Sequence, residues 1–276
     1  MEKFYAVIGD PIAHSLSPQM HNEQFQHFGI NAHYLPLHIT TENLSVAIKG
    51  LKAVGISGFN VTLPHKVAIM ELLDEIDPLA SSIGAVNTVV HLNGKYIGYN
   101  TDGVGFLEGL LSLNIPLKNK KILIIGAGGA ARAIYYTLAS EGYTNIDITN
   151  RTVEKAKVLI EQCQYQTNSQ SLSLQEASEQ LGNYSCVIQT TCIGMKDTMN
   201  EMPLSLKNLK KNTVCCDIIY NPKKTKFLIE AQKSGAIIQN GLEMFVNQGA
   251  IAFEKWTQIK ANREMMKQTV QSIIGG

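Results

Sequence analysis

Lys66 and Asp102 are the only oppositely charged pair that the sequence places near predicted strand ends in its first half. Lys66 follows a strand predicted for Gly58 to Leu63, and Asp102 follows one predicted for Lys95 to Gly98. A lysine held beside a carboxylate can give a proton to a carbonyl oxygen while hydride reaches the carbon. Two structural alternatives exist: a surface ion pair of little energetic value, or Asp102 as the cap of a helix predicted for Val104 to Leu113.

Uncharged hydrogen-bonding side chains form a second group of candidates at predicted loop tips. Such a group suits a polyhydroxylated substrate, because each hydroxyl both donates and accepts. Its members are Ser15, Ser17, Asn60, Thr62, Asn87, Thr101 and Gln248. Ser17 also has a structural interpretation, as the N-cap of a helix predicted for residues 18 to 28 with Pro18 at its first position.

The stretch from Lys121 to Arg132 joins a short apolar strand to a glycine turn and a helix. Gly126-x-Gly128-x-x-Ala131 fits the dinucleotide-binding fingerprint, whose last position accepts Gly or Ala. Gly126 permits the tight turn, Gly128 lets the backbone approach a pyrophosphate, and Ala131 allows close packing of helix on strand. A glycine-rich turn without a ligand is the alternative, but the strand before and the helix after favour a dinucleotide.

The end of the next predicted strand, Ile146 to Thr149, indicates which dinucleotide binds. An NAD site has Asp or Glu there to accept from the ribose 2′-hydroxyl. This chain instead has Arg151 and Lys155, which suit a 2′-phosphate, and its nearest acid, Asp147, lies inside the strand. The sequence therefore predicts NADP as the cofactor.

Length, charge and cysteines narrow the class of protein. The 276 residues with 45% hydrophobic content suffice for two globular domains. A net charge of +1, without long runs of one sign, favours a small-molecule partner over nucleic acid or a membrane. Five cysteines without C-x-x-C spacing indicate reduced thiols and a cytoplasmic location, and no histidine pair has metal-ligand spacing.

Alternating strands and helices predict a parallel α/β sheet in each half of the chain. The predicted strands are residues 5–9, 34–38, 58–63, 84–90, 95–98, 122–125, 146–149, 186–191, 214–219 and 237–238. The predicted helices are residues 18–28, 44–54, a segment after Lys66 that ends at Leu73, 104–113, 130–140, 225–234 and 242–259. Asn93-Gly94 predicts a hairpin, and residues 114–119 a linker. Ligands of such sheets collect at the carboxyl ends of strands.

Eight motifs in order resemble those of the shikimate dehydrogenases, from residue 9 to about residue 257. They are Gly9-x-Pro11-Ile-x-His14-Ser-x-Ser-Pro18-x-x-His21-Asn22, Asn60-Val-Thr-x-Pro-x-Lys66, Gly84-Ala-Val-Asn-Thr88, Gly98-x-Asn-Thr-Asp102, Gly126-Ala-Gly-Gly-Ala130, Asn150-Arg-Thr152, Asp217-x-x-Tyr-Asn-Pro222 and Gly241-Leu-x-Met-x-x-x-Gln248. The resemblance implies reversible NADPH-dependent reduction of 3-dehydroshikimate to shikimate, a step toward aromatic amino acids.

The resemblance also implies roles for individual residues. Lys66 would be the general acid/base and Asp102 its orienting partner. Substrate-binding positions would be Ser15, Ser17, Asn60, Thr62, Lys66, Asn87, Asp102, Tyr220 and Gln248. Cofactor-binding positions would be Gly126, Ala127, Gly128, Gly129 and Ala130 for the pyrophosphate, Asn150, Arg151, Thr152 and Lys155 for the adenosine phosphate, and Thr190, Ile218 and Gly241 elsewhere, the last two near the nicotinamide. Thr191-Cys192-Ile-Gly-Met195 departs from the family pattern, in which Cys192 would be Pro or another small residue.

The resemblance implies an α/β fold of two domains. Residues 1–103 and 240–276 would form a mainly parallel substrate domain, to which the C-terminal helix returns, and residues 104–239 an inserted Rossmann-type NADP domain. As partners we expect the small-molecule substrate and, at most, a second copy of the chain in a homodimer. Two rival functions stay open: a quinate/shikimate dehydrogenase that uses NAD, and a catalytically silent dinucleotide-binding regulator.

Overall fold

The computed structural model describes residues 2 to 275, which divide into two compact units. The first unit runs up to Gly105 and resumes at Val246, and the second is Phe106–Phe245. Both changes of unit fall inside helices, α4 (Asp102–Leu111) and α9 (Leu242–Thr257), shortly after the boundaries expected from the sequence.

A six-stranded mixed sheet in the order β2-β1-β3-β5-β6-β4 forms the centre of the first unit. Its strands are β1 (Lys3–Gly9), β2 (Ala32–His38), β3 (Gly58–Val61), β4 (Glu75–Ile76), β5 (Thr88–Leu92) and β6 (Lys95–Tyr99). Pairing is parallel except on both sides of β5, which runs antiparallel to β3 and β6. Asn93 and Gly94 join β5 to β6 with φ angles of 51° and 77°, which confirms the predicted hairpin.

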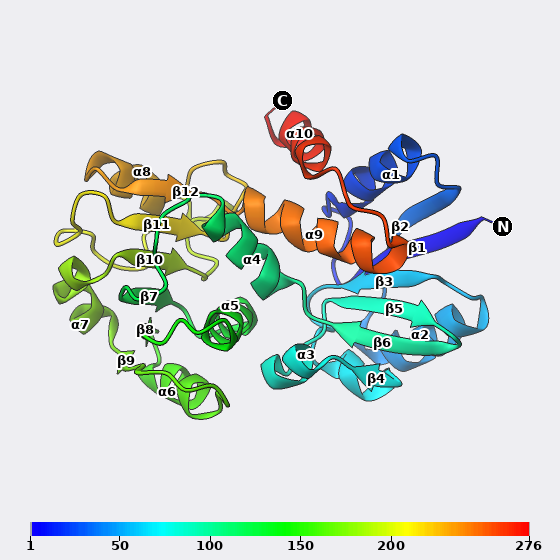
Figure 1. Cartoon of the computed structure of the whole chain (residues 1–276), viewed down its shortest axis with the longest axis horizontal. Helices are drawn as coiled ribbons and strands as arrows, with labels where there is room; N and C mark the ends of the chain where they lie inside the picture. The colour runs from blue at the N-terminus through cyan, green and yellow to red at the C-terminus, as the bar shows by residue number, and fades with distance from the viewer. Residues whose placement is uncertain (1, 276) are drawn as a thin grey trace. The chain divides into compact units, whose positions relative to one another are not determined.

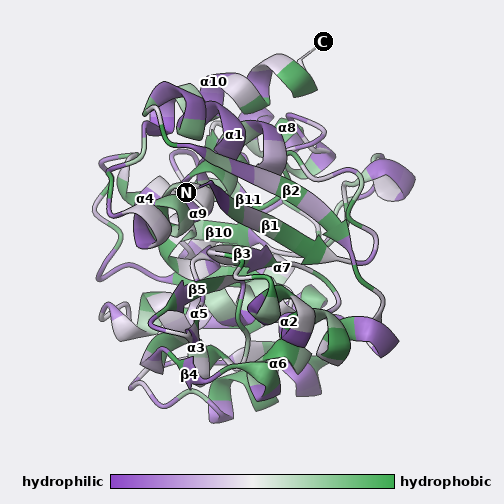
Figure 2. Ribbon diagram, turned by 90° about the vertical axis from the view of Figure 1, so that its right-hand side faces the viewer, coloured by the Kyte–Doolittle hydropathy of each residue, from purple (hydrophilic) through white to green (hydrophobic). Residues whose placement is uncertain are grey.

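The helices that belong wholly to this unit are α1 (Ser17–His27), α2 (Leu44–Ala53), α3 (Pro78–Ile83) and α10 (Arg263–Ile274). The sequence prediction missed α3 and α10, and the helix expected after Lys66 is only a short 3-10 segment, Ala68–Leu72. α3 is too short to show a helical period, although Asp77 caps its start by accepting from the Leu79 and Ala80 amides. α10 is largely polar, with a few hydrophobic positions that Figure 2 shows as green segments among purple ones.

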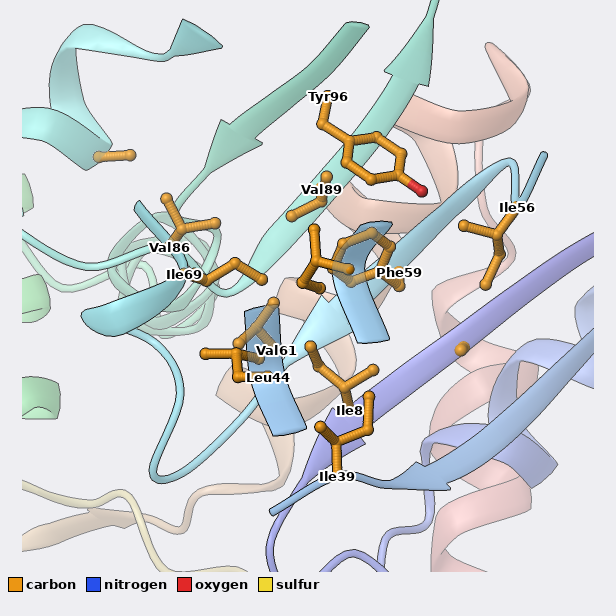
Figure 3. Close-up of a cluster of buried hydrophobic side chains, with 13 residues drawn as sticks. Ile8, Ile39, Leu44, Ile56, Phe59, Val61, Ile69, Val86, Val89 and Tyr96 are labelled. Atoms are coloured by element: carbon orange, nitrogen blue, oxygen red, sulfur yellow. The ribbon is translucent and has the colours of Figure 1, made fainter. Parts of the chain in front are cut away.

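One hydrophobic cluster of the first unit packs on one face of this sheet (Figure 3), and on the opposite face Tyr5 of β1 stacks on Phe25 of α1. Phe59 and Val61 of β3 and Ile8 of β1 pack against Leu44 and Ile69, which come from the helical segments between strands. This packing explains why β1 and β3 read as nearly continuous apolar runs: helices cover strands that hydrogen-bond on both edges. β2 has only one neighbour, and its first four residues alternate between buried and exposed while the last three are exposed or intermediate. Figure 2 shows both hydrophobic and hydrophilic residues along this strand.

The second unit is an all-parallel sheet in the order β12-β11-β10-β7-β8-β9, which Figure 1 shows strand after strand. Its strands are β7 (Ile122–Ile125), β8 (Ile146–Thr149), β9 (Ser171–Leu172), β10 (Cys186–Gln189), β11 (Val214–Asp217) and β12 (Ile237–Gln239). Its own helices are α5 (Gly129–Ser140), α6 (Val153–Glu161), α7 (Leu174–Glu179) and α8 (Lys226–Lys233). Counted from β7, the strand order is that of the Rossmann fold, with its topological switch point between β7 and β10.

Four strands of the second unit, β7, β8, β10 and β11, are buried along their whole length. They contain two carboxylates, Asp217 at the end of β11 and Asp147 in β8, and Asp147 is paired. Its carboxylate lies 2.8 Å from the Lys121 ammonium and accepts hydrogen bonds from the Tyr184 hydroxyl at 2.7 Å and the Gln170 amide at 3.0 Å. Those partners offset the desolvation of a charge inside a sheet. The sequence prediction missed α6, α7 and β9; α7 and β9 are short, whereas α6 does contain apolar residues, among them the buried Ala156 and Leu159. None of the described helices is both long and apolar enough to cross a membrane.

Candidate active site

The sheet register of the first unit brings the predicted substrate residues to one edge. Asn60 near the end of β3 pairs with Thr88 at the start of β5, and Thr88 also pairs with Tyr99 at the end of β6. Because β5 is antiparallel to both neighbours, its first residue meets their last ones. The segments that follow β3 and β6, which carry Lys66 and Asp102, therefore begin at the same edge.

Lys66 and Asp102 form the ion pair that the sequence suggested. The Lys66 Nζ lies 2.6 Å from Asp102 Oδ2, and the two side chains are 27% and 13% exposed. Asp102 is the first residue of α4 rather than its cap, and its second oxygen accepts from Asn87 Nδ2 at 2.7 Å. The capping alternative is therefore wrong. The two side chains are largely buried, and Asn87 is a third partner of the carboxylate. These two features distinguish the pair from an exposed surface ion pair, which leaves the proton-donor interpretation.

Asn60 and Asn87 are buried beside this pair. Asn60 Nδ2 donates to the Asn87 main-chain oxygen at 3.1 Å and to Thr88 Oγ1 at 3.0 Å. Asn87 Oδ1 accepts from the Thr101 amide at 2.8 Å. The two asparagines and Asp102 therefore belong to one hydrogen-bonded group whose orientation the fold determines.

Ser15 and Ser17 lie at the start of α1, but the N-cap interpretation of Ser17 is wrong. Ser17 is the first residue of the helix, the cap position is Leu16, and no side chain caps this end. Ser15 Oγ instead accepts a 3.3 Å hydrogen bond from the Ser17 amide. Ser17 is buried and Ser15 is partly buried, and both residues belong to the first unit.

Thr62 and Gln248 also belong to the first unit, whereas Tyr220 belongs to the second. The Thr62 methyl fills the space beside Gly9, where an added Cβ would lie 2.5 Å from it. Gln248 lies in α9, with its backbone against Gly105 of α4. Tyr220 stacks on Phe245 with ring centroids 4.8 Å apart. The structure thus brings all but one of the predicted substrate residues into the first unit.

The glycine turn has the geometry that the fingerprint requires. Gly126 has a φ of 114°, which excludes most side chains, and a Cβ there would lie 2.5 Å from Thr190 Oγ1. Ala127 follows it in the turn. Gly128 is the N-cap of α5, which no side chain caps, and a Cβ on Gly128 or Gly129 would meet no atom within 4 Å. The backbone N–H groups at this helix start are thus open to a ligand, and Ala130 continues the first turn.

The end of β8 presents two cations. Arg151 and Lys155 are exposed, and neither has an ion pair among the described residues, while Asn150 Nδ2 bonds the Thr152 main-chain oxygen at 2.9 Å. Asp147 is committed to Lys121 and Tyr184, as described above, so it is not free to accept from a ribose hydroxyl. The donors at this strand end therefore fit a phosphate.

Thr190, Ile218 and Gly241 have structural roles that the sequence did not reveal. The Thr190 hydroxyl donates to the Ile125 main-chain oxygen at 2.7 Å, linking β10 to β7 at the switch point. An added Cβ on Gly241 would lie 1.9 Å from the Ile218 main-chain oxygen, so only glycine fits there. Burial raises the pKa of nearby Asp217 to about 6, although its carboxylate accepts from Thr225 Oγ1 and the Ile219 amide.

The sequence prediction assigned no role to three residues in or beside this hydrogen-bonded group: Tyr34, Thr88 and His21. The Tyr34 hydroxyl donates to Asn60 Oδ1 at 2.7 Å, and His21 stacks on Tyr34 with centroids 4.5 Å apart. Burial lowers the pKa of His21 to about 3. Thr88 and His21 stood inside quoted motifs without a predicted role, and Tyr34 gave no signal beyond its predicted strand, because the contacts of these residues join distant segments. Among the described residues, no cluster of His, Cys, Asp and Glu could hold a metal.

Comparisons with known proteins agree with this geometry. Residues 7–89 match the shikimate dehydrogenase substrate binding domain, residues 110–229 the shikimate/quinate 5-dehydrogenase domain and residues 241–271 the shikimate 5′-dehydrogenase C-terminal domain. A shikimate dehydrogenase (NADP(+)) from Bacillus cereus is 58% identical over the full length of both chains.

Two solved structures extend the comparison to the fold. A shikimate dehydrogenase in complex with NADP+ is 42% identical, with a TM-score of 0.92 over 99% of this chain and 96% of the other. One from Thermus thermophilus, in complex with NADP(H) and shikimate, is 34% identical with a TM-score of 0.88 over 98% and 99%. With three matching domains and full-length relatives, the chain belongs to the NADP-dependent shikimate dehydrogenases, a family of oxidoreductases.

Proposed function

We propose that Lys66 and Asp102 are the catalytic pair with which this chain interconverts 3-dehydroshikimate and shikimate. The observation that carries the proposal is the half-buried 2.6 Å contact between the Lys66 Nζ and Asp102 Oδ2, at the edge where Asn60 and Asn87 also lie. An ammonium in that position can pass one proton to a substrate carbonyl oxygen and take it back from the hydroxyl.

One proton and one hydride are transferred in each direction of the reaction. In reduction, the C3 carbonyl carbon accepts a hydride and its oxygen accepts the Lys66 proton, which yields the C3 hydroxyl. In oxidation, Lys66 takes the proton from that hydroxyl. Asp102 orients the Lys66 ammonium and accepts a hydrogen bond from a substrate hydroxyl. It holds the lysine in place during both reduction and oxidation.

NADP(H), when bound, supplies or accepts that hydride. The residues at the expected site fit it, because the space over Gly128 and Gly129 is open, no side chain caps α5, and two exposed cations follow β8. Gly126 to Ala130 would bind the pyrophosphate with backbone N–H groups. Asn150, Arg151, Thr152 and Lys155 would bind the 2′-phosphate, with Thr190, Ile218 and Gly241 completing the cofactor site.

The remaining polar residues would bind the substrate ring. Hydroxyl and amide groups match the hydroxyls of the ring, since they can donate and accept as each oxygen requires, and they can donate to its carboxylate. This set comprises Ser15, Ser17, Asn60, Thr62, Asn87, Tyr220 and Gln248.

One set of assays tests the function: oxidation of shikimate and of quinate, each with NADP and with NAD. We expect shikimate with NADP to give the highest kcat/KM. Faster turnover of quinate with NAD would favour the quinate dehydrogenase alternative. No turnover of either substrate by folded protein would favour a regulator.

Cytoplasmic location and a homodimer also belong to this proposal. Five free cysteines support a reducing compartment.

Exposed Phe4 and Leu35, on β1 and the edge strand β2, provide an apolar surface that a second copy could cover. Light scattering of the purified protein measures the oligomeric state, and a monomer at assay concentration would exclude the dimer.

A further inference from the structure

A chain of buried hydrogen bonds runs from Tyr34 of β2 to the catalytic pair. We propose that its two hydroxyl-bearing links, Tyr34 and Thr88, are positioning residues that hold Asp102 and the amides of Asn60 and Asn87 in their working orientation. The proposal rests on the assignment of Lys66 and Asp102 made above, and it gives roles to two residues outside that assignment.

Each link of the chain is a hydrogen bond of ordinary length. Tyr34 Oη donates to Asn60 Oδ1 at 2.7 Å, and Asn60 Nδ2 donates to Thr88 Oγ1 at 3.0 Å. Thr88 Oγ1 donates to Asn87 Oδ1 at 3.0 Å, and Asn87 Nδ2 donates to Asp102 Oδ1 at 2.7 Å. The other Asp102 oxygen accepts from Lys66, so the chain ends on the carboxylate of the catalytic pair.

The direction of the chain follows from groups that can only donate or only accept. Asn60 Nδ2 lies 3.1 Å from the Asn87 main-chain oxygen, which only accepts, so the Asn60 amide cannot be reversed. Asn87 Oδ1 lies 2.8 Å from the Thr101 amide, which only donates, and this contact fixes the Asn87 amide in the same way.

Because both amide groups are fixed, few acceptors are available to the hydroxyl protons of Tyr34 and Thr88. Tyr34 Oη faces the Asn60 amide oxygen and donates to it, and the Ser17 side chain is a further hydrogen-bond partner of Tyr34. Thr88 Oγ1 accepts a hydrogen bond from Asn60 Nδ2, so its own hydroxyl proton points onward to Asn87 Oδ1 or to Thr101 Oγ1, which lies 3.2 Å away. Donors then align in one direction toward an anion, an arrangement in which each hydrogen bond strengthens the next.

Burial makes each hydroxyl difficult to replace. Tyr34 and Thr88 are 1% and 0% exposed, so water cannot take over a lost link. Stacking on His21 fixes the Tyr34 ring, and the ring centroids of Trp256 and Tyr34 lie 6.0 Å apart. The chain also restricts recognition: both Asn60 amide protons are in use, so Asn60 can offer a substrate only its Oδ1, as an acceptor.

The test removes each hydroxyl without changing the shape of its side chain. In Tyr34→Phe and Thr88→Val we expect kcat/KM for shikimate to fall about three- to tenfold, the worth of a neutral hydrogen bond, while KM for NADP stays at the wild-type value. Thr88→Ser, which restores the hydroxyl, should recover most of the loss. Shikimate should also raise the Tm of both variants less than that of the wild type, a readout that does not need turnover.

Matched controls remove buried hydroxyls that make no hydrogen bond. Tyr96 and Thr149 have such hydroxyls, so Tyr96→Phe and Thr149→Val report the cost of substitution alone. If Tyr34→Phe and Thr88→Val resemble these controls, or if Thr88→Ser does not recover activity, the proposal is wrong. An inactive wild-type protein would instead contradict the proposed function.

A double-mutant cycle separates positioning from general packing. If Thr88 acts through Asn87, Thr88→Val should have little further effect on kcat/KM in an Asn87→Ala background. Full additivity of the two changes would show that Thr88 acts independently of Asn87 and would overturn the proposal.

Discussion

The two units prepare their proposed sites in opposite ways. In the first unit the side chains at the site already bind one another, as the contacts from Lys66 through Asp102 to Asn87 show. In the second unit the site consists of backbone around Gly128 and of exposed cations such as Arg151, whose ion-pair partner is not found among the described residues.

This difference suits the two ligands. A proton transfer needs its acid/base group within hydrogen-bond reach and in one orientation, which only buried partners enforce. A pyrophosphate is large and strongly charged, and N–H groups at a helix start bind it without any special side chain. Removing a side chain at the site in the first unit should therefore lower the rate of the reaction. Removing one at the site in the second unit should lower the preference for one cofactor over the other.

The largest effect should follow from Lys66→Ala. General acid/base catalysis contributes about a hundred- to ten-thousandfold, so kcat should fall by that order while cofactor binding is kept. The measurement is kcat at saturating shikimate and NADP, with the Tm as a control for folding. Retention of more than about a tenth of wild-type kcat would remove Lys66 from the mechanism, because it lies outside that range.

Arg151→Ala should act on cofactor choice. A charge-assisted contact to a 2′-phosphate is worth about 1.5 to 3 kcal/mol, so the wild type should prefer NADP over NAD at least tenfold and the variant should lose most of that preference. The readout is the ratio of kcat/KM for the two cofactors. An unchanged ratio would show that Arg151 does not contact the phosphate.

Buried titratable groups should give the two units opposite pH dependences. Burial lowers the pKa of His21 to about 3, below its unfolded value, so the free energy of unfolding should fall on acidification, by about 2 kcal/mol at pH 5. Burial raises the pKa of Asp217 to about 6, above its unfolded value. The contribution of this group to the free energy of unfolding is therefore fully present below its unfolded pKa, and it is lost as the pH rises through about 6.

Urea unfolding between pH 4 and pH 8 measures both slopes. His21→Phe should remove the acid-side loss, and Asp217→Asn should remove the loss on the side of rising pH. The change of slope is the readout, since each substitution also alters absolute stability. Identical slopes in wild type and both variants would mean that neither group titrates within its unit as burial predicts.

The smallest effects should come from Ser15→Ala and Gln248→Ala. Each removes one neutral hydrogen bond, so KM for shikimate should rise about two- to tenfold with little change in KM for NADP. Ser15 also accepts from the Ser17 amide, so its variant needs a Tm control. Unchanged KM for shikimate would leave Ser15 with its local role in the loop alone.

Local sequence determined most elements and much of the chemistry. Buried strands such as Ile122–Ile125, the Asn93-Gly94 turn and the glycine fingerprint are visible because their signals lie within a few residues. The order of motifs likewise pointed to the family, and Lys66 and Asp102 were predicted to act together although 36 positions separate them.

Tertiary structure alone decided how these residues are held. The sequence could not show that Asp102 begins α4 instead of capping it, that Asp147 is consumed by Lys121 and Tyr184, or that Tyr34 orients Asn60. Each of these facts depends on strand register and on contacts between distant segments. A residue type fixes what a group can donate or accept, but only the packed sheet decides which partner it meets.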